Sequence, residues 1–158
     1  MKNKIQIFTL LLIIVTLAAC RFDEGPMLSF RKVEDRVQKH FTLMEFTKDG
    51  VDMTQELADS CGKEWQFLTK QEASGKLNNL MVCPTDSIFP YQGNYFISDN
   101  KKNIKMYITT FSIPAIYIGM EPFKKDIRTT WRIERLAKDE MWLSCTYNNS
   151  DYYLKFKE

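Results

Sequence analysis

The end of the chain decides the fold. Residues 130–156 read TWRIERLAKDEMWLSCTYNNSDYYLKF, three runs rich in aromatic and aliphatic residues separated by short polar turns. The middle run alternates in full, with Met141, Leu143, Cys145 and Tyr147 on one face and Trp142, Ser144 and Thr146 on the other. A period of two gives a strand one buried face, and short turns between such strands indicate an antiparallel meander.

The same signal recurs upstream of this stretch. The expected strands are His40–Thr47, Glu64–Lys70, Leu77–Cys83, Asn94–Ser98, Ile104–Thr110, Thr130–Leu136, Met141–Tyr147 and Tyr152–Phe156. Before them, Ser29–Lys39 has apolar residues at helical spacing and predicts a short amphipathic helix that Ser29 can cap. A meander of about eight strands normally closes, because closure removes exposed edges. The sequence therefore predicts an all-β domain that closes into a barrel.

The first twenty residues have the parts of a secretory signal. Two lysines in the first four residues precede an apolar run, which ends in Leu17-Ala18-Ala19-Cys20. The run is too short to cross the roughly 30 Å hydrocarbon core as a helix. The stretch LAAC resembles the bacterial lipobox, whose cysteine is lipidated after cleavage. We therefore expect a signal peptide over 1–19, lipidated Cys20 with a tether over 20–26, and one domain over 27–158.

Two further stretches carry a resemblance to a family. One is FRKVEDRVQKHFTLMEFTKDGVD at residues 30–52, and the other is a closing pattern made by Trp131, Ile133, Leu136, Asp139, Glu140, Met141 and Leu143. Together with the lipobox, they resemble the lipocalin-like lipoproteins of Bacteroidota over most of residues 26–158. Where lipocalins open on Gly-x-Trp, this chain has His40-Phe41-Thr42. The resemblance implies a lipocalin-like barrel.

Charge argues against nucleic acid as a partner. The chain has 22 basic and 20 acidic residues, and cleavage before Cys20 removes Lys2 and Lys4, which leaves a net charge of zero. A nucleic-acid binder needs a basic face to collect phosphates. The pairs Lys101-Lys102 and Lys124-Lys125 are instead typical of solvated turns.

Lipidation of Cys20 leaves three cysteines. Cys61 and Cys83 stand at the ends of expected strands and are the first choice for a disulfide in an oxidising compartment, with three unpaired thiols as the alternative. Cys145 lies among apolar residues and is expected to pack as a small hydrophobe. No cysteine and histidine spacing indicates a metal site.

No set of acid, base and nucleophile converges in the sequence. His40 is the only histidine and falls where the helix meets the first strand, a position typical of solvated side chains. Glu134 and Glu140 could form a carboxylate pair for glycoside hydrolysis, but solvated charges explain both. We therefore expect no enzyme activity and no cofactor apart from the covalent lipid on Cys20.

Outward aromatic residues suggest a contact surface instead. Alternation places Tyr107, Trp142 and Tyr153 on the face away from the larger apolar set. The segment Thr109–Lys125 is apolar, lacks clean alternation and has two prolines, so it is either a packed edge or a docking loop at the barrel rim. Ile116 and Tyr117 are its candidate contact residues.

Two functions follow from these observations. The first is a membrane-anchored, non-enzymatic binding module that holds a small apolar or glycan ligand in the barrel mouth. The alternative is an accessory surface subunit that docks on an outer-membrane complex such as a nutrient importer. Asp23 and Glu24, just after the lipidated cysteine, resemble the signal that sends Bacteroidota lipoproteins to the cell surface. We expect an outer-membrane lipoprotein at the cell surface, with the periplasmic face as the alternative.

Overall fold

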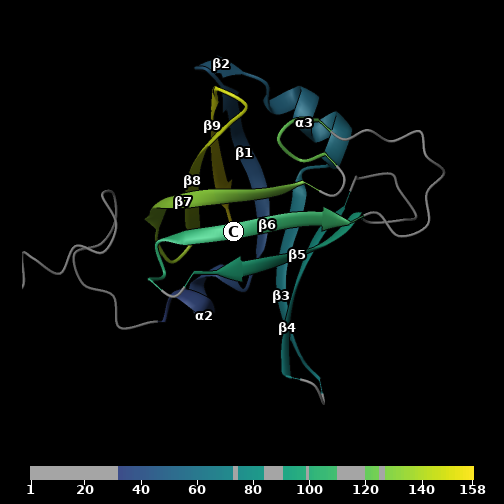
Figure 1. The fold of residues 1–158 in the computed structure, drawn as a ribbon, viewed down its shortest axis with the longest axis vertical. Coiled ribbons are helices and arrows are strands. Elements are labelled where there is room, and N and C mark those ends of the chain that lie inside the picture. Colours follow the sequence, from purple (N-terminus) through teal and green to yellow (C-terminus); the bar gives the residue numbers. More distant parts are fainter. Residues whose placement is uncertain (1–31, 73–74, 84–90, 99, 110–119, 125–126) are drawn as a thin grey trace, which may run out of the picture.

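Antiparallel strands pair in chain order through the domain. The computed structural model describes residues 32–72, 75–83, 91–98, 100–109, 120–124 and 127–158. Within them the strands are β1 (His40–Lys48), β2 (Val51–Asp52), β3 (Glu64–Glu72), β4 (Gly75–Cys83), β5 (Tyr91–Ile97), β6 (Asn103–Thr109), β7 (Arg128–Leu136), β8 (Glu140–Tyr147) and β9 (Ser150–Lys157). The sheet order is β2-β1-β3-β4-β5-β6-β7-β8-β9 (Figure 1). The expected meander is confirmed.

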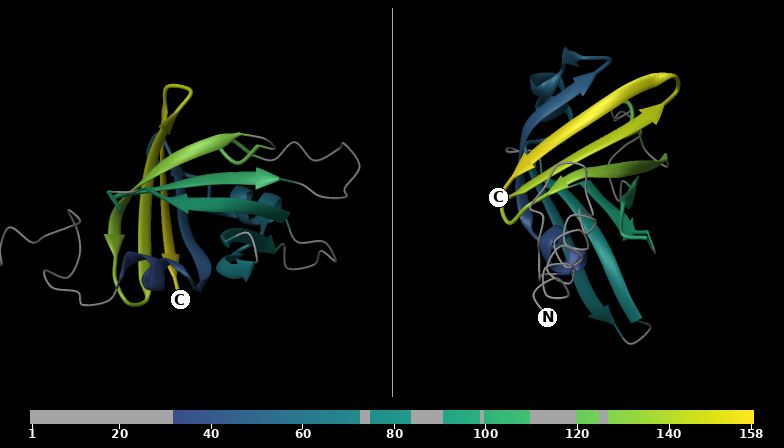
Figure 2. Two further views of the ribbon diagram at one scale, coloured as in Figure 1. Left: turned by 60° about the horizontal axis from the view of Figure 1, so that its bottom comes forward. Right: turned by 90° about the vertical axis from the view of Figure 1, so that its left-hand side faces the viewer.

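Pairing of the first and last long strands closes the sheet. β1 lies antiparallel to β9, from Thr42 opposite Lys157 to Lys48 opposite Tyr152. In the described residues this makes a closed, lipocalin-like barrel of eight strands, with the two-residue β2 added at the edge of β1. β5, β6 and β7 run across β1, β8 and β9 at a steep angle, so the two groups face each other around the core (Figure 2).

The core has the composition that alternation predicts. Its described members, all buried, include Phe41, Phe46, Trp65, Phe67, Tyr95, Ile104, Met106, Trp131, Met141, Leu143, Tyr152, Leu154 and Phe156. The aromatic rings of the core pack against one another. The ring of Phe67 meets those of Phe41 and Tyr95 edge to face, with 6.0 Å and 5.2 Å between the ring centroids. Such pairs add to the stabilisation from burial. The described core lies between Val33 and Phe156, so we expect the barrel to fold without residues 1–20.

The predicted N-terminal helix is present but short. α2 (Val33–Val37) buries both valines and Arg36. The Arg36 guanidinium donates a hydrogen bond to the carbonyl of Leu136, at the end of β7. Lys39 contacts the carbonyl of Lys138 and forms an ion pair with Glu158. These contacts hold α2 against one end of the barrel; the proposed cap, Ser29, lies outside the described residues.

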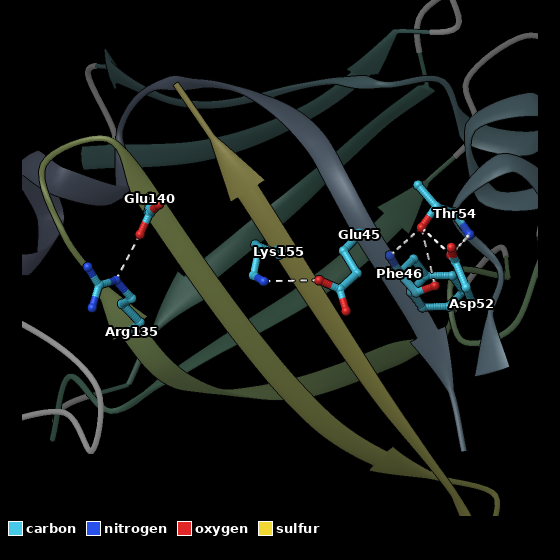
Figure 3. Close-up of polar contacts among 7 residues, drawn as sticks. All are labelled: Glu45, Phe46, Asp52, Thr54, Arg135, Glu140 and Lys155. Atoms are coloured by element: carbon cyan, nitrogen blue, oxygen red, sulfur yellow. Dashed lines mark hydrogen bonds and ion pairs between the residues drawn. The ribbon is translucent and has the colours of Figure 1, made fainter. Parts of the chain in front are cut away.

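A second helix, α3 (Thr54–Cys61), lies between β2 and β3, where the sequence analysis predicted no helix. Leu57 and Cys61, one helical turn apart, are buried against the barrel. The helix is joined to β1, since the Met53 amide donates to the Phe46 carbonyl at 2.8 Å. The Phe46 amide in turn donates to Thr54 Oγ1 at 2.8 Å (Figure 3). No helix among the described residues is long and apolar enough to span a bilayer.

Candidate functional site

A hollow opens where α2 meets the barrel. Its volume is about 580 Å³, and its described lining is Lys32, Glu34, Asp35, Gln38, Thr69, Asn78, Ile97 and Lys101. Thr69, Asn78 and Ile97 continue the inward-facing positions of β3, β4 and β5, two residues beyond buried Phe67, Leu80 and Tyr95. The hollow is therefore the α2 end of the barrel interior, at the end where the β3–β4 hairpin extends past the barrel (Figure 1).

Two residues that line the hollow, Thr69 and Asn78, belong to a hydrogen-bonded group of three side chains whose third member is buried Tyr95. Thr69 and Asn78 are paired across β3 and β4, and Thr69 Oγ1 donates to Asn78 Oδ1 at 2.8 Å. The hydroxyl of Tyr95 lies 3.3 Å from Thr69 Oγ1. Burial raises the pKa of Tyr95, so its hydroxyl keeps its proton and can donate. The group fixes the positions of an amide and two hydroxyls.

Among the described residues that line the hollow, the two lysines, Lys32 and Lys101, are matched by two acids, Glu34 and Asp35. The ammonium of Lys101 lies 2.8 Å from Glu34 Oε1. A lining with equal positive and negative charge does not select a strongly ionic ligand. The amide, hydroxyl and charged groups together offer both donors and acceptors, which suits a ligand rich in hydroxyl groups.

The predicted contact aromatics lie on the outer face. Trp142 is half-buried, with the Arg135 guanidinium carbon 5.0 Å and the Lys155 ammonium 4.7 Å from its ring centroid. Tyr153 meets Trp142 edge to face at 6.5 Å. Tyr107 lies apart from this pair and is covered by Arg128 at 5.2 Å. Cations lie over the rings of Trp142 and Tyr107, which leaves these two rings less open to a partner than alternation alone suggests.

The cations over Trp142 are themselves held by acids. Arg135 Nε lies 2.8 Å from Glu140, and Lys155 Nζ lies 3.0 Å from Glu45 (Figure 3). Beside them, a shallow groove of about 400 Å³ crosses the outer face of β6 to β9, and its described lining is Asn103, Thr130, Arg132, Glu134, Ser144, Cys145, Thr146, Asp151 and Tyr152. This face is polar and internally paired.

The residues considered for catalysis are not brought together. Glu134 accepts a hydrogen bond from Ser144 at 2.5 Å, whereas Glu140 pairs with Arg135. His40 is exposed at the start of β1, opposite Gln66 of β3. Each side chain has the surroundings expected of a surface residue.

The side chain of Cys83 lies outside the described residues, so the structure does not test the expected pairing of Cys61 with Cys83. Cys61 is a buried free thiol at the end of α3. The backbone of Cys83 lies opposite Glu64, three residues after Cys61, so the pair remains a prediction for the oxidised protein. Cys145 is also buried and free, and burial, with a smaller effect from the Asp151 carboxylate, raises its pKa to about 12. Cys20, Ile116 and Tyr117 lie outside the described residues.

Sequence reasoning did not select the residues that border the hollow. The available signal was a polar side chain at an inward position of a strand, as Thr69 follows Trp65 and Phe67. Lys101 and Glu34 could not be paired in advance, since their contact joins a turn to a helix 67 positions away. No protein-family model matches the chain, and no curated protein sequence matches it.

Proposed function

We propose that the protein is a membrane-anchored, non-enzymatic binding lipoprotein whose ligand is a small glycan held in the hollow at the α2 end of the barrel. The observation that carries the proposal is the lining of that hollow, in which Thr69, Asn78 and Gln38 stand beside two lysines and two acids. Its volume of about 580 Å³ falls within the range of small-molecule sites.

The glycan is favoured over the apolar ligand by the same lining. Ile97 is the single aliphatic side chain among the described residues that surround the hollow. Further inside, Tyr95 and Phe67 are fully buried against each other and against the rest of the core. An apolar ligand at this end would displace water from the half-buried polar side chains of the lining without replacing its hydrogen bonds, whereas sugar hydroxyls can replace them.

Anchoring rests on the N-terminal sequence. The lipobox-like LAAC supports lipid attachment at Cys20, and two or more acyl chains anchor a protein stably. The proposed place is the outer membrane at the cell surface, with the periplasmic face as the alternative. The proposed family is the lipocalin-like lipoproteins of Bacteroidota, in keeping with the closed barrel.

Calorimetric titration with neutral oligosaccharides, such as maltotriose and cellotriose, tests the proposal. Thr69→Val keeps the shape of the side chain but removes the hydroxyl, and we expect it to weaken binding about tenfold. Thr130→Val makes the same change on the exposed outer face of β7 and is expected to bind as the unchanged protein does. Equal loss in both variants, or no binding across a broad panel of neutral glycans, would exclude this function.

A second function, docking as an accessory subunit on an outer-membrane complex, is favoured by the groove across β6 to β9. That groove lies beside the Trp142–Tyr153 pair and exposes Thr146. Thr146→Arg is expected to abolish copurification of a membrane protein from mildly solubilised membranes, and Gln92→Arg, on exposed β5, is expected to leave it intact. Copurification that survives Thr146→Arg would rule out this face.

A further inference from the structure

The β5–β6 hairpin exposes a large aromatic side chain beside two exposed lysines. Phe96 is 53% exposed, and it lies opposite Lys105 on the neighbouring strand. Side chains that are paired in this way on one face of a sheet are direct neighbours. Lys102, in the turn of the same hairpin, is also exposed. Phe96, Lys102 and Lys105 together are called the hairpin patch below.

The lysines of the hairpin patch are available to a partner. Neither ammonium forms an ion pair with an acid among the residues that the structure describes. Lys101, next in the turn, differs because it is bound to Glu34. The patch therefore combines an apolar ring with two free positive charges, a combination that suits the interface of an anionic membrane.

The hairpin patch lies at the end of the barrel that the tether reaches. The Lys101–Glu34 ion pair joins the turn of the hairpin to α2, and α2 begins directly after Lys32 (Figure 1). The chain from Cys20 to Lys32 spans at most about 40 Å when fully extended. A lipid on Cys20 would thus keep the start of α2 within about 40 Å of the bilayer, where even weak contacts are favoured by high effective concentration.

We propose that the hairpin patch is a second, non-covalent membrane contact, in which Lys102 and Lys105 bind anionic lipid headgroups and Phe96 enters the interface. The contact would turn the α2 end of the barrel, with its hollow, toward the lipid surface. The placement near the membrane rests on the proposed lipidation of Cys20, but the affinity of the patch for lipid does not. An acidic protein is the competing partner, and the experiment distinguishes the two.

Cosedimentation with vesicles tests the proposal on the chain from Arg21 to Glu158, which has no lipid. We expect it to sediment with vesicles of phosphatidylcholine mixed with phosphatidylglycerol, but not with phosphatidylcholine alone, and to be released by salt. Lys102→Glu with Lys105→Glu should lower partitioning at least about tenfold. Lys48→Glu with Lys63→Glu makes the same charge change elsewhere on the barrel and should cost much less.

The aromatic contribution has its own matched pair. Phe96→Ser should weaken partitioning several-fold, and Met44→Ser, at a residue that is also 53% exposed, should not. No binding to phosphatidylglycerol vesicles, or equal loss in the control variants, overturns the proposal. Binding to protein-containing cell membranes but not to pure vesicles overturns it in favour of an acidic protein. Thr69→Val, which alters the proposed glycan site, should sediment with vesicles like the unchanged chain. Loss of glycan binding and loss of membrane binding can therefore be told apart.

Discussion

At the scale of single residues, Phe123 is the described core residue that comes from neither a strand nor a helix. Its ring stacks on Trp131 at 5.4 Å and meets Trp65 edge to face at 5.1 Å, and only 3% of the residue is exposed. Alternation could not predict this position, because Thr109–Lys125 has no regular period. By contrast, the inward faces of β6, β8 and β9 followed directly from their alternation.

Phe123→Ala should therefore destabilise the barrel strongly. Removing a buried ring from among other rings leaves a cavity, and the expected loss in the free energy of unfolding is about 3–5 kcal/mol. Phe96→Ala, at an exposed ring, should change it by no more than about 0.5 kcal/mol. Urea denaturation measures both, and similar values for the two variants would show that Phe123 does not pack in the core.

The buried thiols give a second prediction at this scale. Burial raises the pKa of Cys61 and raises that of Cys145 to about 12, so at pH 8 both residues are almost entirely in the unreactive thiol form. Iodoacetamide at pH 8 should leave both residues unmodified in the folded protein, as read by peptide mass mapping. Rapid labelling of Cys145 without denaturant would contradict its burial.

The same mapping decides the predicted disulfide. In urea without reductant, a free Cys61 should be labelled as fast as Cys145. If Cys61 and Cys83 are joined in the protein purified from an oxidising compartment, both stay unlabelled until reductant is added. Labelling of Cys61 without reductant would establish the free thiol seen in the structure.

At the scale of elements, strands were easier to predict than helices. Strands β6, β8 and β9 carry their own signal, because each has buried residues at three alternating positions, as in Ile104, Met106 and Ile108. α3 is eight residues long and contributes only Leu57, Ala58 and Cys61 to the core. A helix this short is stabilised by packing and by its bonds to β1, neither of which is visible in the sequence.

Gly93 gives a prediction about the pairing of β5 with β6. A Cβ atom at this residue would lie 2.2 Å from the carbonyl oxygen of Tyr107 and 2.9 Å from the Cα of Ile108. Both are backbone atoms of the paired strand, so they can move away only if the strands separate. Gly93→Ala should lower the free energy of unfolding by about 1–3 kcal/mol.

Gln92→Ala, at the exposed neighbouring residue of β5, is the control for Gly93→Ala and should be close to neutral. Thermal denaturation followed by circular dichroism compares the two variants. A Gly93→Ala protein as stable as the control would mean that β5 and β6 lie further apart than the structure shows.

At the scale of the whole molecule, closure joins the beginning of the domain to its end. Beyond the β1–β9 ladder, the Asp49 amide donates to the Asp151 carbonyl at 2.8 Å, and the Asp151 amide donates to Asp49 Oδ1 at 2.8 Å. The barrel could be predicted from the sequence, because a meander of eight strands leaves its first and last strands as unpaired edges. Pairing these two strands with each other removes both edges. The hollow was not, because it depends on where α2 comes to lie after closure.

This closing contact should make stability depend on pH. The Asp151 amide, with the Ser150 side chain, lowers the pKa of Asp49 below 3.8. Asp49 therefore binds its proton less tightly in the folded state than in the unfolded state. The stabilisation that its carboxylate gives the folded state is complete above the pKa of the unfolded state, and it is lost as the pH falls through the lower pKa of the folded state. The difference in Tm between the unchanged protein and Asp49→Asn should shrink below about pH 4.

Asp139→Asn changes an exposed aspartate elsewhere and serves as the control for Asp49→Asn. Its difference in Tm from the unchanged protein should stay small throughout the titration. If the difference in Tm between Asp49→Asn and the unchanged protein instead grows in acid, the pKa of Asp49 is not lowered by folding. That result would exclude the carboxylate of Asp49 as the acceptor that closes the barrel.

The proposed anchor gives the last prediction at this scale. Cells fed an alkyne analogue of palmitate should label the unchanged protein, and Cys20→Ala should abolish the label because the acceptor sulfur is lost. Cys61→Ala and Cys145→Ala should keep it, since both cysteines are buried in the folded domain. Incorporation is a better readout than membrane fractionation, because the uncut apolar run over residues 5–17 could itself hold the Cys20→Ala chain on the membrane. Label that persists in Cys20→Ala would place the lipid elsewhere, and the distance argument that keeps the start of α2 near the bilayer would be lost with it.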